Sequence, residues 1–136
     1  MKTTSLIVLS IAFAVSASAA QRTGNAAANA TPEQHKEMMD EVGDSQEDLR
    51  ESIATKDVKA ANAAAVKVQA FMEETQIYWA ARKFADVNKL ADQSVAQSKD
   101  IVKAVSAGKL DEARGALDKL SATCNACHEL HPEQRK

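Results

Sequence analysis

Two cysteines and a histidine near the C-terminus have residue types and a spacing that suit covalent cofactor chemistry. They lie in the stretch CNACH, residues 124–128, which contains both cysteines of the 136-residue chain. Two thiols three residues apart can each add to a vinyl group of haem, and the histidine directly after them can bind the iron. On a helix these positions share one face and can reach the same planar ligand. We therefore predict one covalently bound haem c, with Cys124 and Cys127 forming thioethers and His128 as the proximal iron ligand.

Three other chemistries fit parts of this motif and remain as alternatives. A thiol–disulfide redox pair needs its nucleophilic cysteine at a helix N-terminus, where the dipole lowers the thiol pKa, whereas this pair falls near a predicted helix C-terminus. A zinc site could use Cys124, Cys127, His128 and His131, but four donors within eight residues of one helix surround a tetrahedral ion poorly. A structural disulfide suits an exported protein and leaves the histidine without a role.

The start of the chain has the pattern of a secretory signal peptide. Lys2 is followed by an apolar run over residues 6–15 and then by small residues. The run is too short to span a bilayer, and small residues end it rather than charges, which argues against an uncleaved anchor. We expect removal of residues 1–19, by cleavage after Ala19 or Ala20, and an exported mature protein without a membrane span.

The mature chain has the size of one domain and a mildly acidic charge. Removing the signal peptide leaves 117 residues and, because Lys2 is lost, changes the formal net charge from −2 to −3. Nucleic-acid binding requires a basic face, so we expect no nucleic-acid partner. The charge is compatible with a basic redox partner, although ordinary solubility is the favoured explanation.

Beyond a flexible leader over residues 20–31, which has no apolar period, the pattern predicts only helices. Thr31 and Pro32 suit a helix start, and no proline follows until Pro132. Apolar positions recur at alternating steps of three and four. In the first helix this seam contains Met39, Val42, Gln46, Leu49 and Ile53, and in the last it contains Leu110, Ala113, Leu117, Leu120, Cys124 and Cys127. This pattern predicts four helices, over residues 32–55, 57–83, 86–107 and 110–130.

Short connections between these helices make neighbours antiparallel. The expected fold is therefore all-α, an antiparallel up-down-up-down four-helix bundle over residues 32–136. In that topology the end of the last helix, which carries the cysteines, lies beside the start of the first helix and the end of the second.

Met39 is the best candidate for the distal iron ligand, because it lies on the seam near the start of the first helix and a thioether can bind haem iron. A plain core methionine is the alternative. We expect Val42 and Trp79 to line the haem pocket, although an aromatic side chain in a bundle is by default core. Met38 is out of phase and should border the site. His35 could bind iron instead, but its first-turn position favours solvent or a haem propionate.

These features resemble the class II c-type cytochromes, the cytochrome c prime group and its low-spin, methionine-ligated relatives. The resemblance covers residues 32–135 and rests on a signal peptide, four helices and the C-terminal C-x-x-C-H motif. Met39, four residues before Gly43, matches the pattern of the family's first helix. The chain departs from the family at His35, where an arginine is frequent, and at Pro132, where a basic residue is frequent. Both departures weigh against transferring the family's proximal-side gas chemistry and propionate pairing.

The resemblance implies an exported, non-enzymatic one-electron carrier with His128 and Met39 as axial ligands. Because c-type haem in bacteria is attached outside the cytoplasm, the expected location is the periplasm and the expected partners are periplasmic redox proteins. Relatives are often dimers through their first two helices, and the small residues over 60–65 would allow a homodimer. One alternative is a five-coordinate protein that binds NO or CO at an open distal site lined by Met39, Val42 and Trp79. The other is an exported helical module that handles metals or thiols without haem.

Overall fold

The computed structural model describes residues 24–132, which form five helices and no strand. These are α1 (Gly24–Ala28), α2 (Pro32–Ala54), α3 (Val58–Arg82), α4 (Ala85–Ser106) and α5 (Leu110–Leu130). The prediction of an all-helical fold is confirmed, and each end of the four long helices lies within one residue of its predicted position. The predicted signal peptide over residues 1–19 lies outside the described residues.

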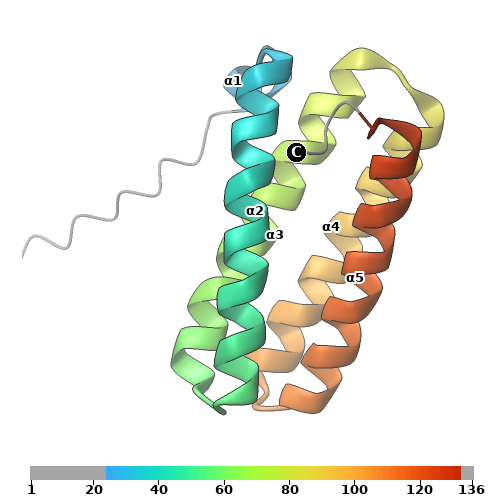
Figure 1. The fold of residues 1–136 in the computed structure, drawn as a ribbon. Helices are drawn as coiled ribbons and strands as arrows, with labels where there is room; N and C mark the ends of the chain where they lie inside the picture. Colours follow the sequence, from blue (N-terminus) through green and yellow to red (C-terminus); the bar gives the residue numbers. More distant parts are fainter. Residues whose placement is uncertain (1–23, 133–136) are drawn as a thin grey trace, which may run out of the picture.

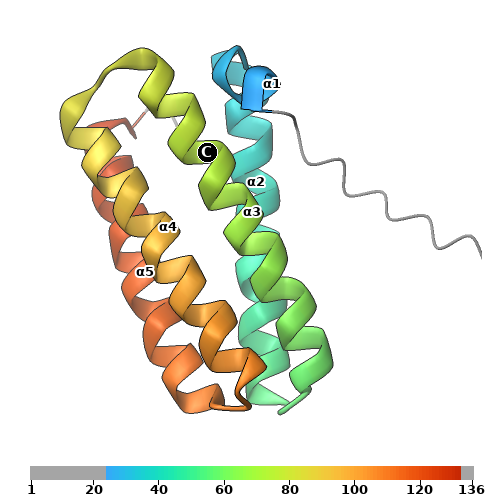
Figure 2. The ribbon, with the colours of Figure 1, turned by 180° about the vertical axis from the view of Figure 1, so that it is seen from behind.

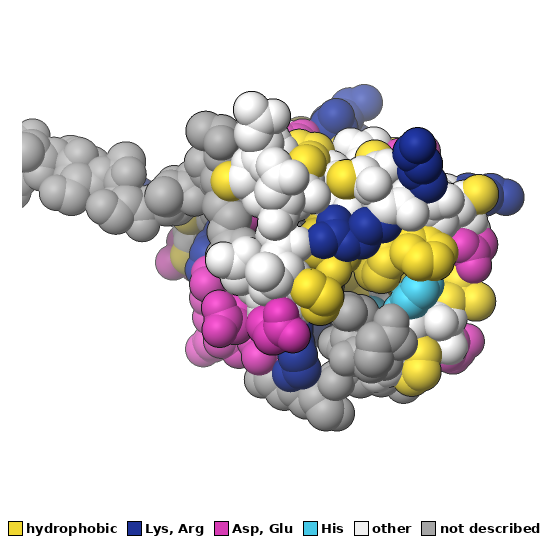
Figure 3. Space-filling model, turned by 90° about the horizontal axis from the view of Figure 1, so that it is seen from above, with side chains coloured by type: hydrophobic (Ala, Val, Ile, Leu, Met, Phe, Trp, Pro, Cys, Tyr) yellow, Lys and Arg dark blue, Asp and Glu magenta, His cyan; other side chains and the backbone are white. Residues whose placement is uncertain are grey.

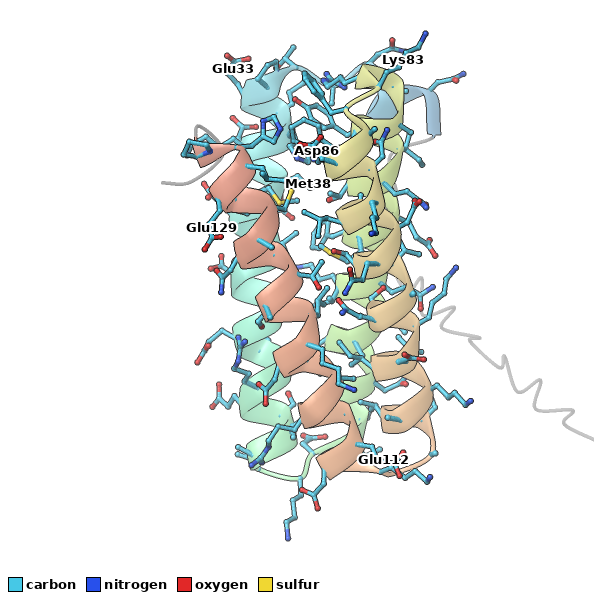
Figure 4. All side chains as sticks on the ribbon, turned by 90° about the vertical axis from the view of Figure 1, so that its right-hand side faces the viewer. Glu33, Met38, Lys83, Asp86, Glu112 and Glu129 are labelled. Carbon is cyan, nitrogen blue, oxygen red and sulfur yellow. The ribbon has the colours of Figure 1, made fainter. Side chains whose placement is uncertain are left out.

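The four long helices lie side by side, with the short α1 against one end (Figure 1). The start of α2, the α3–α4 connection and the end of α5 share this end, which we call the α1 end (Figures 1 and 2). The α2–α3 and α4–α5 connections lie at the opposite end. The side-chain view shows the same division, with Glu33 and Lys83 at the α1 end and Glu112 at the opposite end (Figure 4). Within residues 24–132, none of the helices combines the length and apolar character needed to cross a membrane.

Side chains at the helix starts supply the partners that the first backbone N–H groups lack. At α2, the Thr31 hydroxyl accepts from the Gln34 N–H at 3.2 Å, and the Gln34 side chain accepts from the Thr31 N–H at 2.9 Å. This reciprocal capping box and the proline at the first turn explain why α2 begins where it does. At α3, the Asp57 carboxylate accepts from the Ala60 N–H at 2.9 Å.

The three connections between the long helices each contain a residue with left-handed backbone, Lys56 (φ 58°), Lys83 (φ 61°) and Gly108 (φ 72°). Gly108 is an ordinary helix stop signal, whereas lysine carries no preference for this backbone conformation. Because Lys83 ends α3 in this conformation, α4 begins at Ala85 with Phe84 as its N-cap. Asp86 lies in the first turn of α4.

The aliphatic seam residues form one core along the bundle axis. Its buried members come from all four long helices: Val42, Leu49, Ile53, Ala61, Ala65, Val68, Met72, Val95, Ile101, Ala104, Val105, Ala113, Leu117 and Leu120. A second cluster at the α1 end contains Ala30, Tyr78, Trp79, Val87 and Ala91. Cys124 packs against the first cluster and Cys127 against the second, so the two thiols lie where the aliphatic and aromatic parts of the core meet.

The part of the leader that the structure describes is folded, which differs from the prediction of a flexible segment. Ala27 and Ala30 are buried, and α1 packs against α3. The Arg82 guanidinium at the end of α3 donates to the Ala28 carbonyl at 3.4 Å and to the Ala30 carbonyl at 2.5 Å. A helix of five residues shows no useful apolar period, and its partner Arg82 is more than fifty positions away in sequence. Local pattern could not reveal this contact.

Candidate cofactor-binding cleft

A cleft opens at the α1 end among the four long helices. Its empty space, solvent at the mouth included, is about 450 Å³. Seen down this end, a histidine is bordered by hydrophobic side chains (Figure 3). The lining residues are His35 and Met39 of α2, Met72, Thr75 and Trp79 of α3, Leu90, Ala91 and Ser94 of α4, and Cys124, Cys127, His128 and His131 from α5 and the residue after it.

The three motif residues line this cleft together, from the last two turns of α5. Cys124 and Cys127 are both thiols and are not joined in a disulfide. Burial raises the pKa of the Cys124 thiol, against smaller lowering effects from the Gln46 side chain, a backbone hydrogen bond and the Arg50 charge. A raised pKa and a place near the helix C-terminus are the opposite of what a redox-active nucleophilic cysteine requires.

The donors of the zinc alternative do not form a cluster. Among the described residues, no group of three or more His, Cys, Asp or Glu side chains lies close enough together to hold a metal ion. Haem iron needs one or two protein ligands, whereas structural zinc needs four.

The adjacent methionines of α2 point into different spaces. Met39 lines the cleft together with the motif residues. Met38 is buried in a separate small space with Ala27, Ala30 and Tyr78 (Figure 4). Met39 therefore has access to a ligand in the cleft, and Met38 does not share that wall.

Trp79 lies on the cleft wall, as expected, whereas Val42 lies in the aliphatic core next to the cleft. Trp79 lines the cleft and is only 4% exposed. Its indole lies 4.7 Å from the His131 ring and 5.9 Å from the Phe84 ring, between centroids. Val42 belongs to the aliphatic core and is not among the residues that line the cleft. One turn along α2 thus separates the cleft wall at Met39 from the closed core at Val42.

His35 is buried, contrary to the expectation of a solvated first turn. Its side chain is 2% exposed, and its ring stacks on Tyr78 with centroids 3.7 Å apart and planes 6° apart. The Arg82 guanidinium lies 3.4 Å from the centroid of the same tyrosine ring. Two groups this close to one ring centre must lie on its opposite faces, so Arg82, Tyr78 and His35 form one stack. Ala27 and Ala30 of the folded segment 24–30 line the same small space as His35 and Tyr78, so this segment contributes to the burial.

Sequence reasoning gave no cofactor role to several other wall residues, including Met72, Thr75 and Ser94. The two hydroxyls donate to carbonyls of their own helices, Thr75 to Phe71 and Ser94 to Leu90, both at 2.9 Å. Since these protons are used within the backbone, they leave the α3 and α4 walls largely apolar in character. The seam spacing of Met72 and Thr75 predicts burial, but nothing in the sequence separates a cleft wall from ordinary core.

Comparison of the chain with protein families, with curated proteins and with solved structures gives no match.

Proposed function

We propose that this protein is an exported c-type cytochrome that carries one electron at a single covalently bound haem c. The observation that supports it is the shared cleft, in which the C-x-x-C-H motif of α5 and Met39 of α2 line the same apolar space. In this proposal the long helices form an antiparallel up-down-up-down four-helix bundle of the kind found in class II c-type cytochromes.

The residues present fit the chemistry of such a group. Cys124 and Cys127 supply thiols for two thioether bonds, and His128 supplies an imidazole nitrogen for the iron. The apolar walls and the Trp79 indole would pack against a macrocycle and exclude water from it. When bound, the haem would supply a one-electron ferric/ferrous couple.

Met39 decides between electron transfer and ligand binding. A thioether from Met39 opposite His128 would fill both axial positions and raise the reduction potential. No substrate would then reach the iron without displacing a protein ligand, so we propose a carrier rather than an enzyme. His35 is held in its stack with Tyr78, which argues against its use as the distal ligand.

The location and partners belong to the same proposal. A signal peptide over residues 1–19, cleaved after Ala19 or Ala20, would deliver the chain to the periplasm, where its partners would be redox proteins. The resemblance to class II cytochromes also suggests a homodimer through α2 and α3, where the small residues over 60–65 would allow close packing.

The test is the electronic spectrum of the holoprotein, expressed with haem-maturation machinery. We expect a low-spin spectrum in both oxidation states and a methionine-to-ferric-iron band that is lost in Met39→Ala. Met38→Ala is the matched control, because it removes the same side chain one position away and should leave the band in place. A high-spin ferrous form that binds carbon monoxide rapidly would replace this proposal by the gas-binding alternative. A colourless or zinc-loaded protein would contradict both.

A further inference from the structure

A buried glutamine links α2 to one of the motif cysteines. Gln46 is 9% exposed and lies in the apolar seam of α2 between Val42 and Leu49. Its side-chain nitrogen donates to the Cys124 sulfur at 3.9 Å, across from α2 to α5. A buried amide costs free energy unless its polar atoms are paired. The position therefore carries a polar group where an aliphatic residue would otherwise be favoured.

Ser121 contacts the Gln46 side chain, and Arg50 in turn contacts Ser121. The Ser121 hydroxyl lies 3.3 Å from the Gln46 side-chain oxygen, and its one proton can go there or to the Leu117 carbonyl at 3.0 Å. The Arg50 guanidinium donates to the Ser121 hydroxyl at 2.6 Å. A polar network thus runs from the exposed Arg50 through Ser121 and Gln46 to the sulfur that lines the cleft.

We infer that Gln46 is a positioning residue, which holds the Cys124 sulfur in the orientation required for thioether formation. This inference rests on the proposed function. A cysteine side chain has one torsion with three staggered wells, and a donor fixed by Ser121 favours the well that brings sulfur to it. The lowering effect of Gln46 and Arg50 on the Cys124 pKa agrees with both groups acting on this sulfur.

The covalent step balances without any further reactant. The Cys124 thiol adds across a vinyl double bond: sulfur bonds to one vinyl carbon, the thiol hydrogen goes to the other, and the double bond becomes single. Nothing leaves and no oxidant is consumed. The product sulfur keeps its lone pairs, so Gln46 can continue to donate to it as a weak acceptor.

The experiment has one arm without haem and one with it. Because the chain has two cysteines, Cys127→Ser leaves Cys124 as the only S–H oscillator, whose Raman band reports hydrogen bonding at that sulfur. We expect Gln46→Leu in this background to shift the band. In the haem arm, Gln46→Leu is made in the chain that keeps both cysteines. Peptide mass spectrometry of this holoprotein should show a several-fold rise, relative to wild type, in chains attached through Cys127 alone. Ser121→Ala, at a half-exposed site, should shift both readouts in the same direction by less.

Gln76→Leu is the matched control, because Gln76 donates to the Asp92 carboxylate at 2.7 Å, between α3 and α4. It should change neither readout. An unchanged S–H band in Gln46→Leu, or wild-type attachment at both cysteines in Gln46→Leu and Ser121→Ala, would overturn the inference while the proposed function stands. If the wild-type chain itself acquires no covalent haem, the proposed function fails and this inference fails with it.

Discussion

The two ends of the molecule use the same helical repeat for different purposes. At the opposite end the seam is aliphatic, and residues such as Leu49, Ile101 and Leu117 are almost completely buried. At the α1 end the same seam continues into histidines, aromatic rings and thiols that line a cleft. Apolar spacing therefore predicts which positions face inward at both ends, but only the residue types tell core from site.

This difference implies that one end of the bundle mainly stabilises the fold and the other end forms the candidate site. The aliphatic end buries the surface that holds the four long helices together, since apolar burial is the main favourable term in folding. The α1 end contains the cleft, and specific polar contacts hold parts of the chain near it, with Arg82 donating to the Ala30 carbonyl and Gln46 to the Cys124 sulfur. Substitutions at the aliphatic end should change stability, and substitutions at the α1 end should change the binding of the proposed haem.

The largest effect is expected for His128→Ala. In the proposed site His128 would supply the iron ligand from α5, so loss of its imidazole should prevent formation of a normal holoprotein. The ratio of haem absorbance to protein concentration measures this loss. Stable haem with a wild-type spectrum in His128→Ala would break the assignment of the α1 end as the cofactor site.

Leu117→Ala tests the aliphatic end. Leu117 is 1% exposed, and truncating a buried leucine costs about 2–5 kcal/mol of unfolding free energy. Urea unfolding measures the loss, and the haem spectrum of the folded variant should be unchanged. Leu130→Ala is the matched control, since Leu130 is 49% exposed and should change stability by less than about 0.5 kcal/mol. A spectral change in Leu117→Ala with little loss of stability would remove the distinction between the ends.

Arg82→Ala should release the segment 24–30 from the α1 end. Arg82 donates to two carbonyls of this segment and stacks on Tyr78, contacts worth about 1–2 kcal/mol in total for a partly exposed guanidinium. Hydrogen exchange should accelerate over 24–30, and the His35 ring should gain solvent access. Arg82→Lys keeps the charge but not the paired donors, and should restore little. Unchanged exchange in Arg82→Ala would show that other contacts hold the segment.

The smallest effects are expected at the connections, and they should have opposite signs. Gly108→Ala should destabilise the protein by about 1 kcal/mol, because alanine is strained at a positive φ. A Cβ at this position meets no atom within 4 Å, so a steric clash adds nothing to this cost. Lys83→Gly should stabilise it by up to about 1 kcal/mol, because glycine adopts left-handed backbone without strain. Thermal unfolding of both variants measures this pair. Equal signs would mean that backbone conformation does not decide the two turns.

Much of the fold followed from the sequence because it depends on local rules. Alternating steps of three and four place Leu49 and Leu117 inside, and Thr31 with Pro32 marks the start of α2. The left-handed turns at Lys56 and Lys83 were not predicted, because lysine carries no preference for that conformation. Helix α1 was missed for a different reason: it packs against α3 and its end accepts from the distant Arg82, and no local pattern shows such contacts.

The candidate site followed less completely. The spacing of Cys124, Cys127 and His128 predicted one shared face, and the structure has all three on the cleft wall. The burial of His35 was not predicted, because the segment that covers it was taken for a leader. Gln46 was read as one more seam position, since a pattern of burial does not say what an amide donates to. Contacts between side chains on different helices, such as that of Gln46 with Cys124, can be identified only from the three-dimensional structure.

Covalent attachment is the central claim, and acid–acetone extraction of the purified wild-type protein, expressed with haem-maturation machinery, tests it most directly. We predict that the red pigment stays with the precipitated protein, and that it passes into the acetone when Cys124 and Cys127 are both replaced by serine. Pigment that extracts from the wild-type protein, or a wild-type protein that carries none, would contradict the account.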